Sequence, residues 1–181
     1  GWMGLATPGI TVALLDDSLE EVPAGVEGDL AVRVKPARPP GLFRENWGAP
    51  EMTAAVFRGA WYRTGARAIR DAAGYFRFVG RRDDVIKSSG YRIGPFEVES
   101  ALREHPAGQD VAVVGKADAV RGQMVKAFIV LQPGSLPRED LKAEWQQHCR
   151  QLVAPYKAPR EIEFVSTLPK TISGKTRHAV L

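Results

Sequence analysis

The chain has 181 residues, 44% hydrophobic and 25% charged, an ordinary globular composition with room for one medium domain or two small ones. Its formal net charge is +4, with Lys and Arg spread along the chain, which suits a phosphate-bearing small molecule. No RNA-binding or zinc-finger signature accompanies this excess of positive charge, so we expect no nucleic-acid partner. No apolar stretch approaches the roughly 18 residues that span a bilayer, so no membrane span is expected.

The single cysteine, Cys149, excludes an intrachain disulfide framework and favours a reducing compartment, the cytoplasm. Because Trp145 and Leu152 lie at helical spacing from it, we interpret Cys149 as a half-buried helix residue and not as a nucleophile. The N-terminus lacks the order of a signal peptide. It begins at Gly1 without Met, which suggests a processed or excised segment.

The first third of the chain is expected to be mainly β structure. Alternating or continuous apolar runs predict strands at 10–15, 29–34, 60–63 and 74–79. A proline-rich stretch over 35–50 predicts an extended surface loop, and a short helix is expected over 49–57.

The sharpest change in composition is the polar run at residues 80–84, where we place a domain boundary or hinge with exposed backbone. Helices and strands alternate beyond it, so the fold class is α+β. Pro95 suits the first turn of a helix that ends at Pro106, with strands following at 110–115 and 126–131. A second helix begins at Pro137 and precedes a strand at 161–165. Its apolar face is predicted to be Leu141, Trp145, Cys149 and Leu152.

Three segments combine small residues with Lys or Arg, namely 62–65, 80–95 and 169–176. Amides and cations in such loops can approach phosphate oxygens closely, although solvated turns with surface cations explain the same pattern. The triplet Gly174-Lys175-Thr176 is not a P-loop, because Pro169 stands where that motif requires glycine.

The remaining polar residues predict neither a metal site nor a hydrolase triad. The histidines lack metal-ligand spacing, and the serines lack a His–Asp set. Two helical glutamates are expected on a solvated face. These residues are His105, His148 and His178, then Ser88 and Ser89, then Glu97 and Glu99.

Taken in order, the motifs resemble the late core motifs of adenylate-forming enzymes. The resemblance rests on residues 62–65, 80–84, 87–95 and 169–175. Two more segments, 120–128 and 154–160, are similar to signatures of the medium-chain acyl-CoA synthetases. The resemblance covers essentially the whole chain.

The resemblance implies a ligase that activates a carboxylic acid with ATP and Mg²⁺ to an acyl-adenylate and then transfers the acyl group to CoA. Residues 1–79 would end a large N-terminal lobe as a β-barrel-like subdomain. Residues 80–181 would be a mobile C-terminal lobe with a short mixed sheet and flanking helices. The expected partners are the missing N-terminal lobe, the acid, ATP and CoA. The location would be cytoplasmic, or the mitochondrial matrix in a eukaryote.

The resemblance also implies roles for single residues in nucleotide chemistry. Arg81 would contact the ribose, Arg92 would reach the ATP phosphates, and Asp83 would be the hinge. Lys175 would bridge the carboxylate of the acid and the α-phosphate as the catalytic residue. No residue is expected to bind a metal directly.

A further set of residues would bind CoA. Ser89, Gly90 and Tyr91 would line the pantetheine channel. The CoA nucleotide and its phosphates would be held by Arg121, Arg150, Ala158, Pro159 and Arg160.

One position departs from the family pattern. Ala66 stands where the family has an aspartate that binds the ATP ribose. Each lost hydrogen bond to a charged group should weaken nucleotide binding by about 1.5–3 kcal/mol. With the acid pocket also upstream, the fragment alone is expected to be incomplete. A non-catalytic CoA- or nucleotide-binding or regulatory module derived from a synthetase therefore remains an alternative.

Overall fold

The computed structural model describes all 181 residues and divides them into two compact units, Gly1–Asp83 and Asp84–Leu181, each of which is described by itself. The division lies within the segment 80–84, where the sequence places a boundary or hinge, and four residues after the expected end of the N-terminal part at residue 79. Strand β6 (Phe76–Arg81) continues through Gly80, which is buried and pairs with Arg67. The exposed backbone expected at 80–84 therefore begins only after Gly80.

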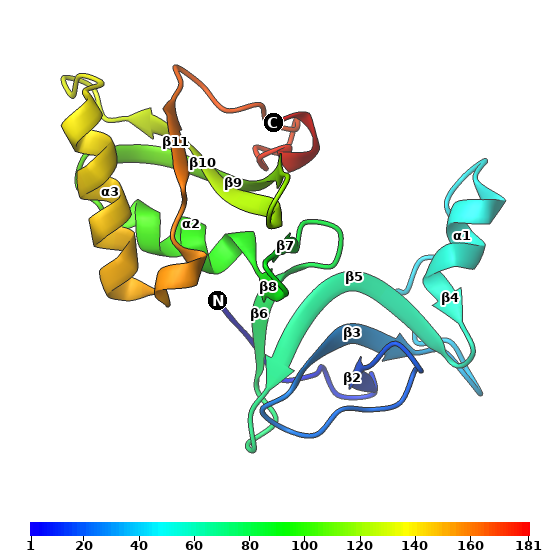
Figure 1. The fold of residues 1–181 in the computed structure, drawn as a ribbon. Helices are drawn as coiled ribbons and strands as arrows, with labels where there is room; N and C mark the ends of the chain where they lie inside the picture. The colour runs from blue at the N-terminus through cyan, green and yellow to red at the C-terminus, as the bar shows by residue number, and fades with distance from the viewer. The chain divides into compact units, whose positions relative to one another are not determined.

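The first unit is an antiparallel sheet with strand path β1-β6-β5-β3-β2, and β4 pairs with β5 (Figure 1). Its elements are β1 (Trp2–Gly4), β2 (Val12–Leu15), β3 (Glu27–Arg33), α1 (Pro50–Val56), β4 (Phe57–Arg58), β5 (Trp61–Arg70) and β6. The predicted helix at 49–57 and the strands at 10–15, 29–34 and 74–79 are confirmed, and β5 is longer than the predicted 60–63.

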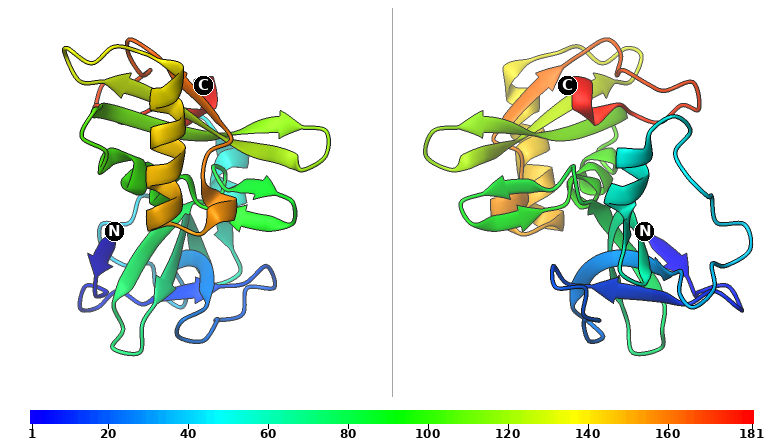
Figure 2. Two further views of the ribbon diagram at one scale, coloured as in Figure 1. Left: turned by 60° about the vertical axis from the view of Figure 1, so that its left-hand side comes forward. Right: turned by 90° about the vertical axis from the view of Figure 1, so that its right-hand side faces the viewer.

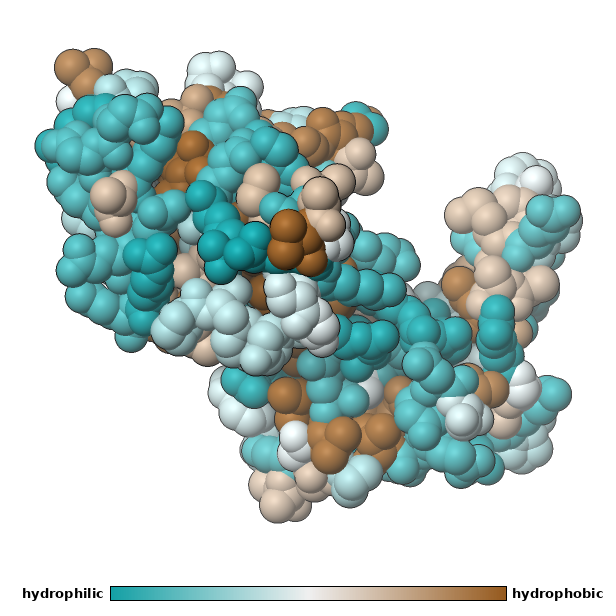
Figure 3. All heavy atoms as spheres, in the orientation of Figure 1, coloured by the Kyte–Doolittle hydropathy of each residue, from teal (hydrophilic) through white to brown (hydrophobic).

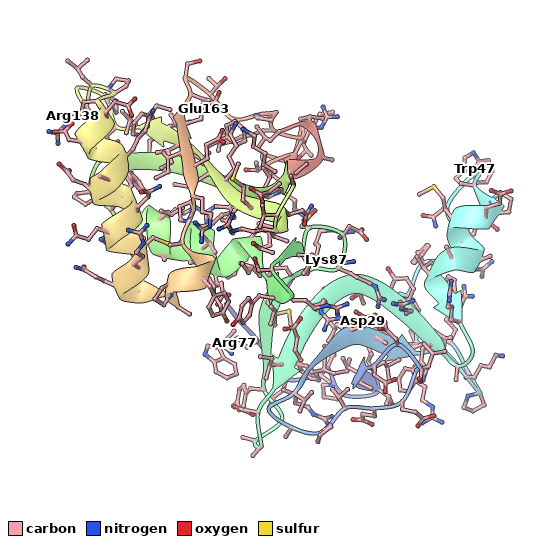
Figure 4. All side chains as sticks on the ribbon, in the orientation of Figure 1. Asp29, Trp47, Arg77, Lys87, Arg138 and Glu163 are labelled. Carbon is pink, nitrogen blue, oxygen red and sulfur yellow. The ribbon has the colours of Figure 1, made fainter.

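The core of the first unit is small and lies on both faces of the sheet. Along β2, alternation sends Leu14 to one face and Ala13 and Leu15 to the other. Helix α1 buries none of its residues. Trp47, just before it, is 94% exposed at the end of this segment (Figure 4).

The second unit has a mixed sheet of path β11-β10-β7-β8, with β9 pairing β10; only the β10–β11 pair is parallel. Its elements are β7 (Ile86–Ser88), β8 (Tyr91–Ile93), α2 (Pro95–Arg103), β9 (Gly108–Asp118), β10 (Gly122–Leu131), α3 (Glu139–Leu152), η1 (Pro155–Lys157), β11 (Glu161–Phe164) and η2 (His178–Val180). None of the three α-helices combines the length and apolarity needed to cross a lipid bilayer.

Both faces of the second sheet are covered. Helices α2 and α3 pack on the face that carries Val111 and Val113 (Figure 2). The opposite face carries Ala112 and Phe128, and the C-terminal segment covers it with Leu168 and Leu181. This arrangement places the glycine-containing 169–176 segment on the face away from the helices.

Both predicted helices of the second unit are confirmed, with two corrections to the apolar face of α3: Cys149 is fully buried where half-burial was predicted, and Leu152 is not buried. Leu141, Trp145 and Cys149 are buried, Cys149 completely, whereas Leu152 is 46% exposed. Leu152 is the last residue of the helix, where α3 has passed the edge of the core. The short strands β7 and β8 were not predicted, because the segment was interpreted as a phosphate loop.

Candidate functional site

The predicted CoA residues begin at a tight hairpin turn between β7 and β8. Ser88 pairs with Tyr91, so Ser89 and Gly90 alone form the turn, with φ of 50° and 83°. Positive φ at both central positions is the geometry of a type I′ hairpin. A Cβ added at Gly90 would meet nothing within 4 Å, so the turn faces open space.

A second turn is hydrogen-bonded to the first. The Ser89 amide donates to the Arg121 carbonyl at 3.0 Å, and Gly122 pairs with Ser88. Asp118 shapes this second turn by accepting the amides of Arg121 and Val120 at 2.8 and 3.0 Å. These backbone hydrogen bonds lower the pKa of the Asp118 carboxyl. The structure therefore brings Arg121 beside the Ser89-Gly90 turn.

An aromatic stack continues the same surface. The exposed ring of Tyr91 stacks on Tyr156 at a centroid distance of 4.2 Å. Tyr156 lies in η1, which Lys157 ties to α2 through a 2.6 Å ion pair with Glu97. The next residues, Ala158 and Pro159, are buried, and Arg160 is exposed.

The structure thus collects most of the predicted CoA residues but not all of them. Ser89, Gly90, Tyr91, Arg121 and the segment 156–160 are connected by contacts. Arg150 is exposed in the last turn of α3, and no hydrogen bond or ion pair links it to this group.

Two cations lie side by side on the β7–β8 hairpin. Lys87, which is labelled in Figure 4, is paired in register with Arg92, and both side chains are exposed. Neighbouring cations on a hairpin can meet a polyphosphate, which is the role predicted for Arg92. The signal that could have indicated the hairpin is the Ser-Gly pair, a common turn dipeptide.

Lys175 lies on an exposed loop that is hydrogen-bonded internally. Lys170 and Thr176 form an isolated antiparallel bridge, and the Thr171 amide donates to the Lys175 carbonyl at 2.8 Å. The Lys175 amide donates to Thr171 Oγ1 at 3.1 Å. Because these amides are used within the loop, the Lys175 side chain is the part of this residue available to an anion, which agrees with rejecting a P-loop.

The first unit holds a separate cleft of about 240 Å³. Its lining includes Asp29, Ala55, Val56, the 62–65 motif and residues 81–83. Arg81 forms a 3.3 Å hydrogen bond with Asp83. Its guanidinium also lies 3.3 Å from where a Cβ on Gly65 would stand, and the φ of 78° at Gly65 is a conformation that favours glycine. The predicted ribose contact and hinge residue therefore lie in one cleft.

Ala66 follows directly on this cleft and pairs in register with Arg81. Its amide donates to Thr64 Oγ1, and the Thr64 hydroxyl donates to the Leu30 carbonyl at 2.8 Å. The backbone of the motif is thus in place, and the methyl group of Ala66 supplies no carboxylate beside Arg81.

Asp29, which lines this cleft, is the centre of a buried charge cluster that the sequence did not indicate. Asp29 is 4% exposed on β3 and accepts hydrogen bonds from Arg63, Arg67 and Arg82. The arginines lie 34 to 53 residues away in the sequence, so no local pattern connects them to Asp29.

The expectation that Glu99 is solvated is wrong. Glu99 is 5% exposed on α2 and accepts the Val113 amide at 3.0 Å and Arg103 at 3.1 Å. His178 Nε2 lies 2.6 Å from Glu99 Oε1, the oxygen that also accepts the Val113 amide. Glu99 therefore connects α2, β9 and the C-terminal turn. His178 is half-buried and takes part in this contact.

The other two histidines lie together beside α3. The His105 ring stacks on Trp145 at 4.2 Å and meets His148 edge-on at 5.3 Å. Burial, followed by the nearby His148, lowers the pKa of His105. No group of three His, Cys, Asp or Glu residues is arranged to hold a metal ion.

Residues 97–175 match the model of the AMP-binding enzyme C-terminal domain. The mitochondrial acyl-coenzyme A synthetase ACSM3 of Mus musculus is 52% identical over 98% of this chain and 31% of its own length. The human mitochondrial synthetase ACSM1 is 53% identical over 97% of this chain and 31% of its own length. The chain thus spans about 31% of the length of these relatives.

Solved structures show the same fold. An anthranilate CoA ligase, AuaEII, in complex with anthranoyl-AMP has a TM-score of 0.85 and 40% identity, covering 97% of this chain and 33% of its own. A benzoate CoA ligase from Burkholderia xenovorans has a TM-score of 0.85 and 35% identity, covering 99% of this chain and 35% of its own.

Proposed function

Because this chain belongs to the acyl-CoA synthetases of the AMP-binding family, as a C-terminal part, we propose that it supplies the CoA-binding surface and the catalytic lysine of such a ligase. The complete reaction converts a carboxylic acid, ATP and CoA to acyl-CoA, AMP and pyrophosphate through an acyl-adenylate. The part that selects the acid would lie in the portion of the relatives that this chain does not cover, because the chain spans only 31% of ACSM3. We expect the chain alone to be inactive.

The observation that carries the proposal is the surface built around Gly90. The Ser89-Gly90 turn, the Arg121 turn and the Tyr91–Tyr156 stack are joined by direct contacts. A narrow thiol arm can pass the turn at Gly90, which carries no side chain, while Arg121 and Arg160 offer charge to the phosphates of the CoA nucleotide. Arg150 would join them only at the outer end of a long ligand.

The predicted roles in nucleotide binding belong to Arg81 and Arg92. Arg81, held by Asp83 in its cleft, would contact the ribose, and Arg92 with Lys87 would meet the phosphates. Mg²⁺ would enter bound to the phosphates of ATP, as is usual for this ion in ATP-dependent enzymes. Asp83 is the last residue of the first unit, which suits a hinge between two half-reactions.

Lys175 would act by electrostatics. A carboxylate must approach the α-phosphate, and an ammonium placed between two anions offsets their repulsion as charge builds on phosphorus. Removing one such preorganised donor typically costs about 2.7–4 kcal/mol in the transition state. The exposed loop leaves the Lys175 side chain free for this approach.

The test mixes this chain with the separately expressed upstream lobe in ATP, Mg²⁺, CoA and acids of short to medium length, with acyl-CoA followed by mass spectrometry. We expect product that requires both pieces and falls by about 100-fold or more in Lys175→Ala, following the cost of one lost donor. Lys142→Ala, which removes a lysine on the outer face of α3, is the matched control. Product that survives Lys175→Ala would refute the assignment.

Ala66 favours a second candidate, a non-catalytic CoA- or nucleotide-binding module derived from a synthetase. Such a module would bind CoA at the Gly90 surface but give no product from folded, associated pieces. CoA binding by calorimetry, run beside the activity assay, separates the two functions. In a eukaryote the relatives' location would place either form in the mitochondrial matrix.

A further inference from the structure

The loop that carries Lys175 is anchored at its two ends. At one end the Lys170 ammonium lies 2.7 Å from Asp110 Oδ2. At the other end His178 Nε2 lies 2.6 Å from Glu99 Oε1. Between them the loop bonds only to itself, and Ile172 is fully exposed. The direction in which Lys175 projects therefore depends on these two polar anchors, together with Leu168 and Leu181, which pack on the sheet just outside the loop.

The His178 anchor differs from the Lys170 anchor because its partner is fixed. Glu99 is buried, and the Val113 amide and Arg103 hold its two oxygens independently of His178. The Lys170 side chain, in contrast, is about half exposed in its ion pair. An ion pair whose acceptor is buried and oriented resists solvent screening better than an exposed one.

We propose that His178 is a positioning residue for Lys175, which fixes the C-terminal end of the catalytic loop on Glu99 while its imidazole is protonated and loosens that end when it is not. The inference rests on the proposed role of Lys175 for its functional meaning. It adds a pH-sensitive element at the C-terminal end of this loop.

The charges around His178 set the direction of the pH dependence. The hydrogen bond to Glu99 raises the pKa of His178, supported by the charges of Glu99 and Asp84, while burial and Arg103 oppose it. Burial acts to raise the pKa of Glu99, but the bonds from His178 and the Val113 amide together lower it. The ion pair is therefore complete below the ordinary histidine pKa of about 6.5. It is lost as pH rises through the elevated value of the folded protein.

Loss of the proton removes the Coulombic part of the contact and leaves, at most, a neutral hydrogen bond from the ring. A hydrogen bond involving charged partners is roughly twice as strong as a neutral one. Above the His178 pKa the loop is thus held mainly by the Lys170–Asp110 pair and by Leu181 packed on the sheet.

The experiment is NMR spectroscopy of the full chain from pH 5.5 to 9, following the His178 ring signals and the ¹⁵N order parameters of residues 171–177. We expect the order parameters to fall from about 0.85 toward 0.6 in step with the His178 titration. His178→Arg should keep the loop ordered at every pH, and His178→Gln should leave it mobile at every pH. Asp110→Asn, which loosens the other anchor, should retain the pH dependence.

The proposal is overturned if the loop is equally ordered on both sides of the titration, or if His178→Arg titrates like the wild type. The NMR measurement requires no enzymatic turnover. A failed acyl-CoA assay would therefore not affect the conclusion about His178. If the two pieces do form acyl-CoA, the alkaline limb of the rate should move to higher pH in His178→Arg.

Discussion

At the scale of single residues, Ala66 is the position where a substitution should most improve function. It pairs with Arg81, so an aspartate there would stand beside the proposed ribose contact. We expect Ala66→Asp to strengthen ATP binding by about 1.5–3 kcal/mol for each hydrogen bond regained. Calorimetry of ATP binding to the two-piece mixture measures it, with Ala66→Asn as the uncharged control. An unchanged affinity would show that the missing carboxylate does not limit nucleotide binding.

Asp29 is the residue on which the first unit depends electrostatically. Its buried carboxylate accepts hydrogen bonds from three arginines, so Asp29→Asn would leave Arg63 without its counter-charge, while Arg67 and Arg82 would keep only Glu27 and Asp17. Breaking such a buried pair costs about 3–5 kcal/mol. Urea unfolding followed by amide exchange in β5 should show the loss, whereas Asp17→Asn, at a 72% exposed side chain, should cost less than about 1 kcal/mol.

Residue identity and residue environment differ in how far the sequence reveals them. The sequence indicates roles for Ser89, Gly90 and Lys175, because each lies in a segment that combines glycine, serine and lysine. Such a combination restricts the chemistry that the segment can perform. The burial of Asp29 and Glu99 is not, because their partners come from distant strands and from the C-terminal turn. Nothing in the sequence around Glu99 indicates that the backbone amide of Val113, on strand β9, donates a hydrogen bond to its carboxylate.

At the scale of elements, helix α3 is positioned by a close contact with the start of β9. A Cβ on Gly108 would stand 2.6 Å from Trp145 Cη2, and Trp145 is fully buried. We therefore expect Gly108→Ala to destabilise the second unit by about 1–3 kcal/mol. Gly115→Ala, which meets only the end of the Gln123 side chain, is the milder control.

A double-mutant cycle makes the Gly108 prediction specific. In a Trp145→Phe background the indole atoms that a methyl group at position 108 would strike are gone, so Gly108→Ala should cost less there than it does in the wild type. Unfolding free energies of the four proteins, measured in urea, give the coupling. Additive costs would mean that the backbone at β9, and not Trp145, resists the methyl group.

The elements that were predicted are those whose apolar periodicity matches their burial. The stripe of α2 and most of that of α3 face one sheet, so sequence and packing agree. Strands β7 and β8 have three residues each and are dominated by polar side chains, so their pairing depends on the turn and on β10. A hairpin of this length carries too little periodicity to be distinguished from a loop.

At the scale of the whole molecule, the two units differ in the size of their cores. The main cluster of the second unit joins 15 buried residues from sheet and helices, whereas each cluster of the first unit contains three. The mixed polarity of the surface is visible in Figure 3, where brown apolar atoms lie among teal ones. Since hydrophobic stabilisation grows with buried apolar area, the second unit should be the more stable.

The reactivity of the Cys149 thiol can be used to measure this difference in stability between the two units. Burial raises the pKa of its thiol to about 11, so at pH 8 it should react with a thiol reagent only after the second unit opens. We expect increasing urea to abolish amide protection in β5 before Cys149 becomes reactive. If β5 lost its amide protection at the same urea concentration at which Cys149 became reactive, the two units would not have independent stabilities. Adding the upstream lobe should then raise the protection of β5 selectively, because a partner that binds only the folded unit stabilises it and because Trp47 and Met52 expose apolar surface there.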